Sequence, residues 1–302
     1  MQPRRHSLLV PNTIGEPGMH ELVFYDWGDI NSQRVAVCVH GLTRNAHDFD
    51  ALAQALVAKG RRVFTLNMAG RGESAWLADP AGYNYASYVA DCNAVMDNFH
   101  LRGVEWIGTS MGGLIGMMIA SQSNSRIRRL IMNDIGAFLS KEALTRIYEY
   151  VRTMPSRFAD RGEADRYLRA AFAPFNITDP ALWEQFVDSS LITGPDGALR
   201  YACDPAIATP LRAATEDFTK IDDINLTPIW NEVNVPTYVI HGAESDILTT
   251  PTLHAMRATN QNMQTITIPG VGHAPPLMSA EQIRIVTDWL DGTTASLMAA
   301  SF

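Results

Sequence analysis

A serine in a nucleophile-type motif is the residue of this chain with the clearest chemical potential. Ser110 stands in the run Gly108-Thr109-Ser110-Met111-Gly112, which fits the pattern Gly-x-Ser-x-Gly. An apolar run of strand length, 104–107, precedes it and an apolar helical segment, 113–121, follows it. A serine hydroxyl is a poor nucleophile unless it is exposed, aimed and next to a base. Because a sharp strand-to-helix turn supplies the aim, the pattern predicts that Ser110 is a catalytic nucleophile.

A serine nucleophile needs a general base and an acid that orients the base, and candidates for both follow predicted strands. His273 lies in a glycine-rich loop after an apolar run, and we predict that it is the base. Asp246 lies in the loop after another such run, and we predict that it is the acid. Glu244 in the same loop and Asp134 after the 130–132 run are the alternative acids. At Asp134 the competing role is a helix or loop cap.

An oxyanion formed by attack on a carbonyl needs two backbone N–H donors. Met111 follows the nucleophile at the start of a predicted helix, so its N–H is the first expected donor. Leu42, in the turn after the 35–39 run, is the second. Arg44 in that turn could contact a substrate carboxylate, although an ion pair that braces the loop is the competing role. No pair of the three cysteines has metal-ligand spacing, and we expect neither a metal nor a cofactor.

The elements that must position these residues alternate between strands and helices. Short apolar runs are typical of parallel strands buried on both faces; they span 35–39, 63–66, 104–107, 130–132, 237–240 and 265–268. Helical patterns span 45–59, 85–99, 113–121 and 281–290. Residues 22–27 are predicted to form an edge strand before the parallel set. This alternation predicts an α/β protein with a doubly wound, mostly parallel sheet.

The alternation stops in the middle of the chain. Residues 137–228 contain helical patterns over 141–154 and 163–172 between loops with proline and glycine. We predict that 137–228 is an inserted helical cap, and that 1–136 and 229–302 form the core. The cap is rich in large side chains, most of which should form its own core while a few line an apolar pocket. These are Tyr148, Tyr150, Met154, Phe158, Phe172, Phe175, Trp183 and Phe186.

Composition excludes several classes of partner. The net charge is −8 over 302 residues, which gives no basic footprint for nucleic acid or an anionic membrane. No apolar stretch approaches the ~18 residues that span a bilayer. The three widely spaced cysteines and the short N-terminal apolar stretch indicate a reducing, cytoplasmic location. The expected partner is a small-molecule ester, and a homodimer is compatible with the sequence.

Together these residues resemble the α/β-hydrolase superfamily, in its branch of capped serine hydrolases. The resemblance covers the whole chain and rests on four motifs: His40-Gly41, Asn67-Met68-Ala69-Gly70-Arg71-Gly72-Glu73-Ser74, Gly108 to Gly112, and Gly272-His273. It implies an about eight-stranded, mostly parallel sheet flanked by helices, a helical cap and the chain order nucleophile, acid, base. Asn67 and Ala69 depart from the family, which usually has Asp and Pro or Arg there.

Within that superfamily, the single inserted cap and the His40-Gly41 motif look like those of small-substrate esterases, lactonases and carbon–carbon bond hydrolases. We predict hydrolysis of a carboxylic ester or lactone of a small to medium apolar substrate through an acyl-enzyme. The alternatives are a C–C bond hydrolase of the meta-cleavage type and a cofactor-free perhydrolase. Enzymes of the first kind often hold a substrate carboxylate with a cap arginine, for which Arg152, Arg157, Arg169 and Arg212 are available. The alternative outside catalysis is a ligand-binding receptor on the same fold.

Overall fold

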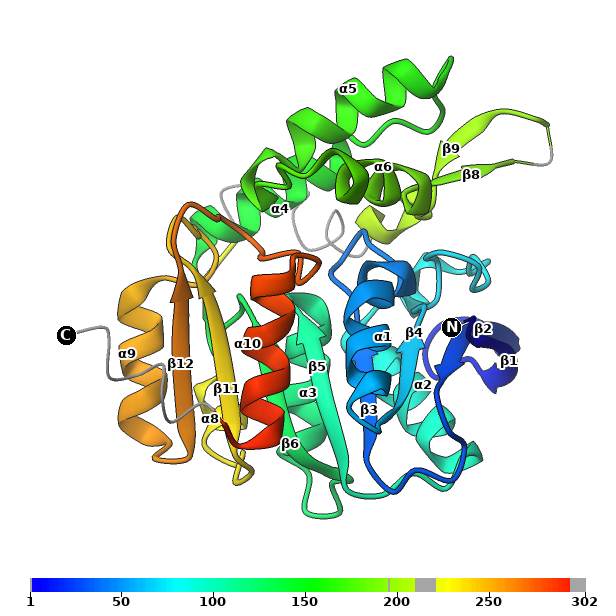
Figure 1. Cartoon of the computed structure of the whole chain (residues 1–302). Helices are drawn as coiled ribbons and strands as arrows, with labels where there is room; N and C mark the ends of the chain where they lie inside the picture. Colours follow the sequence, from blue (N-terminus) through cyan, green and yellow to red (C-terminus); the bar gives the residue numbers. More distant parts are fainter. Residues whose placement is uncertain (1, 195, 210–220, 294–302) are drawn as a thin grey trace.

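A mostly parallel sheet forms the centre of the molecule (Figure 1). The computed structural model describes residues 2–194, 196–209 and 221–293. Eight strands follow the order β1-β2-β4-β3-β5-β6-β11-β12; β1, β2 and β4 pair antiparallel, and all later pairs are parallel. The strands are β1 (Arg4–Pro11), β2 (Met19–Trp27), β3 (Val35–Val39), β4 (Arg62–Leu66), β5 (Val104–Thr109), β6 (Ile127–Asn133), β11 (Thr237–Gly242) and β12 (Met263–Ile268). The predicted architecture is therefore confirmed.

One strand at the edge of the sheet was not predicted. Residues 22–27 were expected to form the edge, but β2 pairs with β4 on one side and with β1 on the other. β1 carries Arg4 and Arg5 and only a short apolar stretch, so its own pattern is weak. Charged side chains on an edge strand disfavour pairing with a strand of another chain, so the arginines of β1 are consistent with its position at the edge of the sheet.

Helices cover both faces of the sheet and bury its apolar side chains. α1 and α10 pack on one face, with Leu52 and Val286 among the buried residues. α2, α3 and α9 pack on the other face, where Cys92 and Met117 are buried. These helices are α1 (Asp50–Ala58), α2 (Tyr85–Asn98), α3 (Met111–Ala120), α9 (Thr250–Thr259) and α10 (Ala280–Asp291). Two buried layers hold the strand ends in fixed positions.

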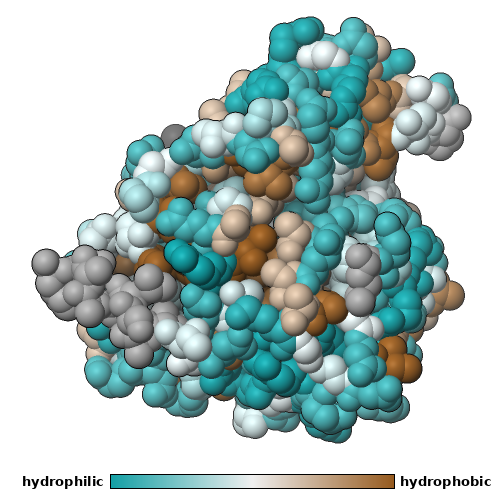
Figure 2. Space-filling model, viewed as in Figure 1, coloured by the Kyte–Doolittle hydropathy of each residue, from teal (hydrophilic) through white to brown (hydrophobic). Residues whose placement is uncertain are grey.

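Most of the described chain between β6 and β11 forms a separate layer over the carboxyl ends of the parallel strands (Figure 1). Its described helices and strands include β7 (Phe138–Leu139), α4 (Lys141–Arg152), α5 (Arg161–Ala171), α6 (Pro180–Ser189), β8 (Leu191–Thr193), β9 (Leu199–Tyr201) and β10 (Ile224–Asn225). The short helix α8 (Thr227–Trp230) follows β10 but lies near the amino ends of the strands, where it packs against α3 (Figure 1). β7 pairs with β10, so the chain leaves and re-enters the core at neighbouring points. On the visible face, apolar side chains gather where this layer meets the core (Figure 2). We call the described part of 137–228 the cap.

Candidate active site

Ser110 sits at a tight turn between β5 and α3. Its backbone has φ +50° and ψ −110°, a conformation that non-glycine residues rarely adopt. A Cβ on Gly108 would lie 2.2 Å from the Gly112 carbonyl carbon, and a Cβ on Gly112 would lie 2.0 Å from the Val39 carbonyl oxygen. The two glycines are therefore required by close backbone contacts, as expected for a strained turn that exposes the serine hydroxyl.

His273 lies between Ser110 and a buried carboxylate. It comes from the loop that joins β12 to α10, and its Nε2 is 2.9 Å from Ser110 Oγ. On the other side of the ring, Nδ1 is 2.7 Å from Oδ2 of Asp134. We call these three residues the Ser110–His273–Asp134 chain. Both ring nitrogens are therefore engaged, which fixes the orientation of the imidazole relative to the serine hydroxyl.

The prediction that Asp246 orients His273 is wrong in geometry, and the alternative, Asp134, occupies that place. Asp246 lies beyond the end of β11 with its side chain 54% exposed, where it pairs with Arg146 of α4. Asp134 directly follows β6 and its side chain is fully buried. Its positive φ of +57° turns the chain at the strand end. Its carboxylate accepts three hydrogen bonds: from His273 Nδ1 at 2.7 Å, from the Gly242 N–H at 2.7 Å and from the Ser245 hydroxyl at 2.6 Å.

The loop after β3 approaches Ser110 and contains the predicted donor Leu42. A Cβ on Gly41 would lie 3.9 Å from the Ser110 Cβ, and Leu42 and Met111 line the same cavity as Ser110. Met111 opens α3, whose first-turn N–H groups have no acceptor within the helix. The two predicted donors therefore stand beside Ser110.

His40 fixes the direction of the peptide that carries the Leu42 N–H. Its Nε2 accepts the Met68 N–H at 3.1 Å, so Nδ1 holds the proton and donates to the Gly41 carbonyl at 2.7 Å. Because a trans peptide points its C=O and N–H in opposite directions, the Leu42 N–H faces away from His40. Complete burial lowers the pKa of His40 to about 3, which Arg71 and Arg44 reinforce, so the ring is neutral at pH 7.

Arg71 lies behind the two predicted oxyanion donors, and sequence reasoning missed it. The guanidinium is fully buried; Nε donates to the Leu42 carbonyl at 2.9 Å, and Nη2 is 3.8 Å from the Met111 sulfur. Nη1 donates to Ala69 and to the Tyr88 hydroxyl, each at 2.7 Å. Arg71 therefore ties the β3 loop and the start of α3 together. The sequence feature that could have pointed to Arg71 is its place in the Asn67–Ser74 motif, but that motif alone does not indicate a role for the arginine.

Arg44 braces the site to the cap. Its side chain is only 3% exposed and its Nη2 lies 2.6 Å from Asp48. Nη1 donates to Ser190 at the end of α6, and the guanidinium carbon lies 3.7 Å from the centre of the Phe186 ring. Arg44 lines the cavity, but its guanidinium is already engaged by these contacts. They favour the role of an ion pair that braces the loop over contact with a substrate.

A largely apolar cavity of about 380 Å³ opens onto Ser110 and His273. The core supplies Tyr83, Tyr85 and Leu114, and α4 of the cap supplies Leu144, Ile147 and Tyr150. Of the cap aromatic residues singled out above, Tyr150, Phe172 and Phe175 line it, while Trp183 and Phe186 are buried in the cap. A pocket of this size and lining suits a small apolar acyl or alcohol group.

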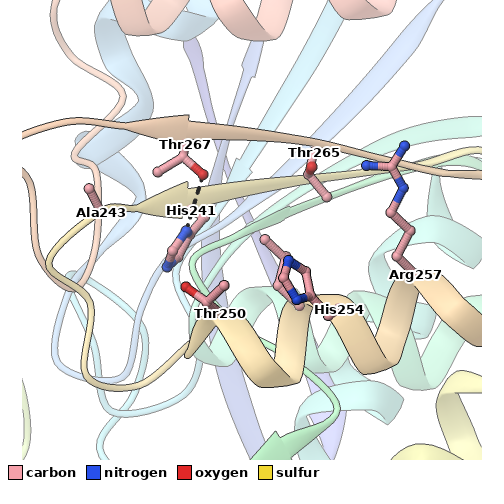
Figure 3. Close-up of a pocket in the computed structure, with 8 residues that line it drawn as sticks. His241, Ala243, Thr250, His254, Arg257, Thr265 and Thr267 are labelled. Carbon is pink, nitrogen blue, oxygen red and sulfur yellow. Dashed lines mark hydrogen bonds between the residues drawn. The ribbon is translucent and has the colours of Figure 1, made fainter. Parts of the chain in front are cut away.

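A second groove, of about 280 Å³, lies between β11, β12 and α9 (Figure 3). His241, His254 and Arg257 line it with several threonines, and His241 is paired with Thr267. No member of the Ser110–His273–Asp134 chain lines this groove. Over the described residues no group of three or more His, Cys, Asp or Glu side chains could hold a metal ion. In the same residues, no helix is long and apolar enough to cross a membrane.

Comparison with known proteins agrees with this fold. Residues 35–278 match the family model for the alpha/beta hydrolase fold. The 3-hydroxybutyrate-oligomer hydrolase of Cupriavidus necator is 37% identical over 284 residues, which cover 92% of this chain and 96% of that protein. A putative non-heme chloroperoxidase of Synechocystis is 24% identical over 90% of this chain and 95% of its own length. The structure of a putative hydrolase from Rickettsia typhi superposes with a TM-score of 0.88 at 32% identity, covering 96% of this chain and 99% of that one. The chain is therefore a hydrolase that belongs to the alpha/beta hydrolase fold family.

Proposed function

We propose that this hydrolase cleaves carboxylic esters by way of an acyl-enzyme on Ser110, with His273 as base and Asp134 as the orienting acid. The observation that carries the proposal is the Ser110–His273–Asp134 chain, whose serine opens into an apolar cavity. The Nδ1–H of His273 donates a hydrogen bond to the Asp134 carboxylate, so the Nε2 lone pair faces the Ser110 hydroxyl. That arrangement is the one general-base catalysis by histidine requires.

The reaction follows from these positions. His273 removes the hydroxyl proton as Ser110 Oγ attacks the ester carbonyl, and the Leu42 and Met111 N–H groups stabilise the oxyanion. The intermediate collapses when His273 returns the proton to the leaving alcohol. A water molecule then loses a proton to His273 and attacks the acyl-serine, which releases the acid and restores the serine.

The substrate class we propose is a short oligoester of a hydroxy acid such as 3-hydroxybutyrate. The relative from C. necator acts by its name on such oligomers, and its similarity spans nearly the full length of both chains. The alignment therefore includes the cap, whose α4 lines the cavity. Each repeat of such an oligomer is small and largely apolar, which suits a cavity of about 380 Å³.

The test is hydrolysis of a linear 3-hydroxybutyrate trimer and of p-nitrophenyl acetate to octanoate by the wild type and by Ser110→Ala. We expect the variant to lose several orders of magnitude in kcat, because no other group replaces the nucleophile. Ser121→Ala, at the far end of α3, is the matched control and should keep full activity. Equal rates in the wild type and Ser110→Ala would refute the proposal.

The alternatives predicted from the sequence use the same residues and stay predictions. The chloroperoxidase name of one relative favours testing peracid formation from acetate and hydrogen peroxide in parallel. C–C bond cleavage is assayed with a vinylogous diketone. Binding of an ester without turnover would indicate the receptor role. The cytoplasmic location and the homodimer also stay predictions.

A further inference from the structure

The active-site cavity carries a cationic group at the cap that the proposed mechanism does not use. Among the described residues that line the cavity, the two arginines are Arg44 and Arg146. Arg44 is buried and engaged by Asp48, Ser190 and Phe186. Arg146, on α4, has a side chain that is 46% exposed, so it can reach a ligand that enters from solvent. The predicted cap cations Arg152, Arg157 and Arg169 do not line the cavity, and Arg212 lies outside the described residues.

Arg146 makes its contacts within the described chain through one edge of the guanidinium. Nη2 donates to Asp246 Oδ1 at 2.6 Å, and Nε lies 2.5 Å from Asp246 Oδ2. A guanidinium has five N–H donors, so the Nη1 group remains for a second anion. Both partners of the pair are about half exposed, and pairs of this kind contribute little to stability. The pair is therefore a weak competitor for an incoming carboxylate.

We propose that Arg146 binds the free carboxylate of an anionic ester, while the ester carbonyl of the same molecule lies at Ser110. The inference rests on the proposed ester hydrolysis and specifies its substrate class. A linear oligoester of a hydroxy acid has one carboxylate, at its acid end. Arg146 at the cap and Ser110 at the strand ends belong to the same cavity, so binding that end selects an ester bond counted from the acid terminus.

Charge supports this assignment. The protein carries a net charge of −8, which disfavours the approach of an anion to most of its surface. Arg44 and Asp48 also line the cavity but are paired with each other, so Arg146 is the guanidinium that can compensate for that repulsion locally and form paired hydrogen bonds with a carboxylate.

Substitutions of Asp246 and Arg146 test the inference, because it predicts that they change the binding of an anionic substrate in opposite directions. If Asp246 competes with the substrate carboxylate, its removal should strengthen binding of the anion, whereas removal of Arg146 should weaken it. If the pair only holds the cap against the core, both substitutions should change substrate binding in the same direction, since each breaks the same contact.

The experiment compares the linear 3-hydroxybutyrate dimer with its methyl ester, which lacks the charge. For Arg146→Met we expect KM for the free acid to rise about tenfold or more, with kcat nearly unchanged and the methyl ester unaffected. For Asp246→Asn we expect KM for the free acid to fall about threefold. Arg152→Met is the matched control, because Arg152 lies on the same helix but is paired with Glu149 and does not line the cavity. It should leave KM unchanged for both substrates.

A second pair of substrates separates this inference from the choice of oligoester. p-Nitrophenyl hydrogen glutarate is anionic and p-nitrophenyl pentanoate is neutral, and Arg146→Met should raise KM for the first alone. Equal effects on charged and neutral esters, or a rise in KM for Asp246→Asn, would overturn the inference while ester hydrolysis stands. A wild type that cleaves neither pair would overturn the proposed function and this inference with it.

Discussion

Replacing Asp134 by asparagine tests the assignment of the acid most directly. The two side chains have the same shape, so the substitution changes the charge and one hydrogen-bonding atom. In the protein, Oδ1 of Asp134 accepts the Gly242 N–H, and Oδ2 accepts from His273 and Ser245. An asparagine amide must place its carbonyl oxygen toward Gly242, because its NH₂ there would face another donor. The NH₂ group therefore takes the position that faces His273.

The size of the effect follows from the tautomer of His273. An NH₂ donor at that position requires a lone pair on Nδ1, so the proton moves to Nε2 and points at the Ser110 hydroxyl, which is 2.9 Å away. The ring then offers no base to the nucleophile. The same exchange in a chymotrypsin-type triad lowers kcat by about 10⁴-fold. This corresponds to about 5.4 kcal/mol in the activation free energy.

The assay is kcat and KM on p-nitrophenyl butyrate, a neutral ester, with thermal unfolding measured for each variant. We expect Asp134→Asn to lose about 10⁴-fold in kcat with a small change in KM and a native melting profile. Asp246→Asn, the acid predicted from the sequence, should keep kcat within about threefold. Retention of more than a tenth of the activity by Asp134→Asn, or a comparable loss in Asp246→Asn, would refute the assignment.

Two further predictions concern the backbone around the site. Because burial lowers the pKa of His40 to about 3 from an unfolded value of about 6.5, the unfolded chain binds the extra proton between these values. The free energy of unfolding should therefore fall as the pH falls below 6.5, by about 1.4 kcal/mol per pH unit from this group. The measurement is denaturant unfolding at pH 6.5 and 4.5, in which the free energy of His40→Gln should depend less on pH than that of the wild type. The same pH dependence in both proteins would contradict the burial argument. Gly112→Ala should lower the free energy of unfolding by about 3 kcal/mol, since the new Cβ would lie 2.0 Å from the Val39 carbonyl oxygen. Gly162→Ala in α5, where the nearest atom is a side-chain oxygen at 3.2 Å, is the control, and equal losses in both variants would count against close packing at the turn.

The sequence predicted the parallel part of the sheet because those strands are buried on both faces and appear as continuous apolar runs. β3, with all five residues buried, is the clearest case. β1 was missed because it lies at the edge, where only Val10 is fully buried and the pattern is mostly polar. Its register is set by pairing with β2, a long-range contact that local periodicity cannot show.

In the site, the sequence singled out Ser110 and His273, which the structure brings within 2.9 Å of each other, because each has a local signature. Glycines around Ser110 and before His273 mark the tight turns that both need. Asp134 and Asp246 both follow strands that end at the same edge of the sheet, so local pattern does not separate them. Arg146 and Arg71 were missed because their roles depend on contacts with segments far away in the chain, Asp246 for the first and Leu42 for the second.

The sheet order explains why either strand could have supplied the acid. β6 lies between β11 and β5, which is followed by Ser110, and the His273 loop follows the outermost strand, β12. The imidazole must therefore find its partner among the ends of β6 and β11. Here β6 supplies the carboxylate of Asp134, while β11 and its loop supply the donors Gly242 and Ser245 that hold it. A carboxylate and its donors can exchange places between adjacent strands without changing the chain order of nucleophile, acid and base. The chain order is thus the same for either acid, whereas the identity of the acid depends on which strand end is buried against His273.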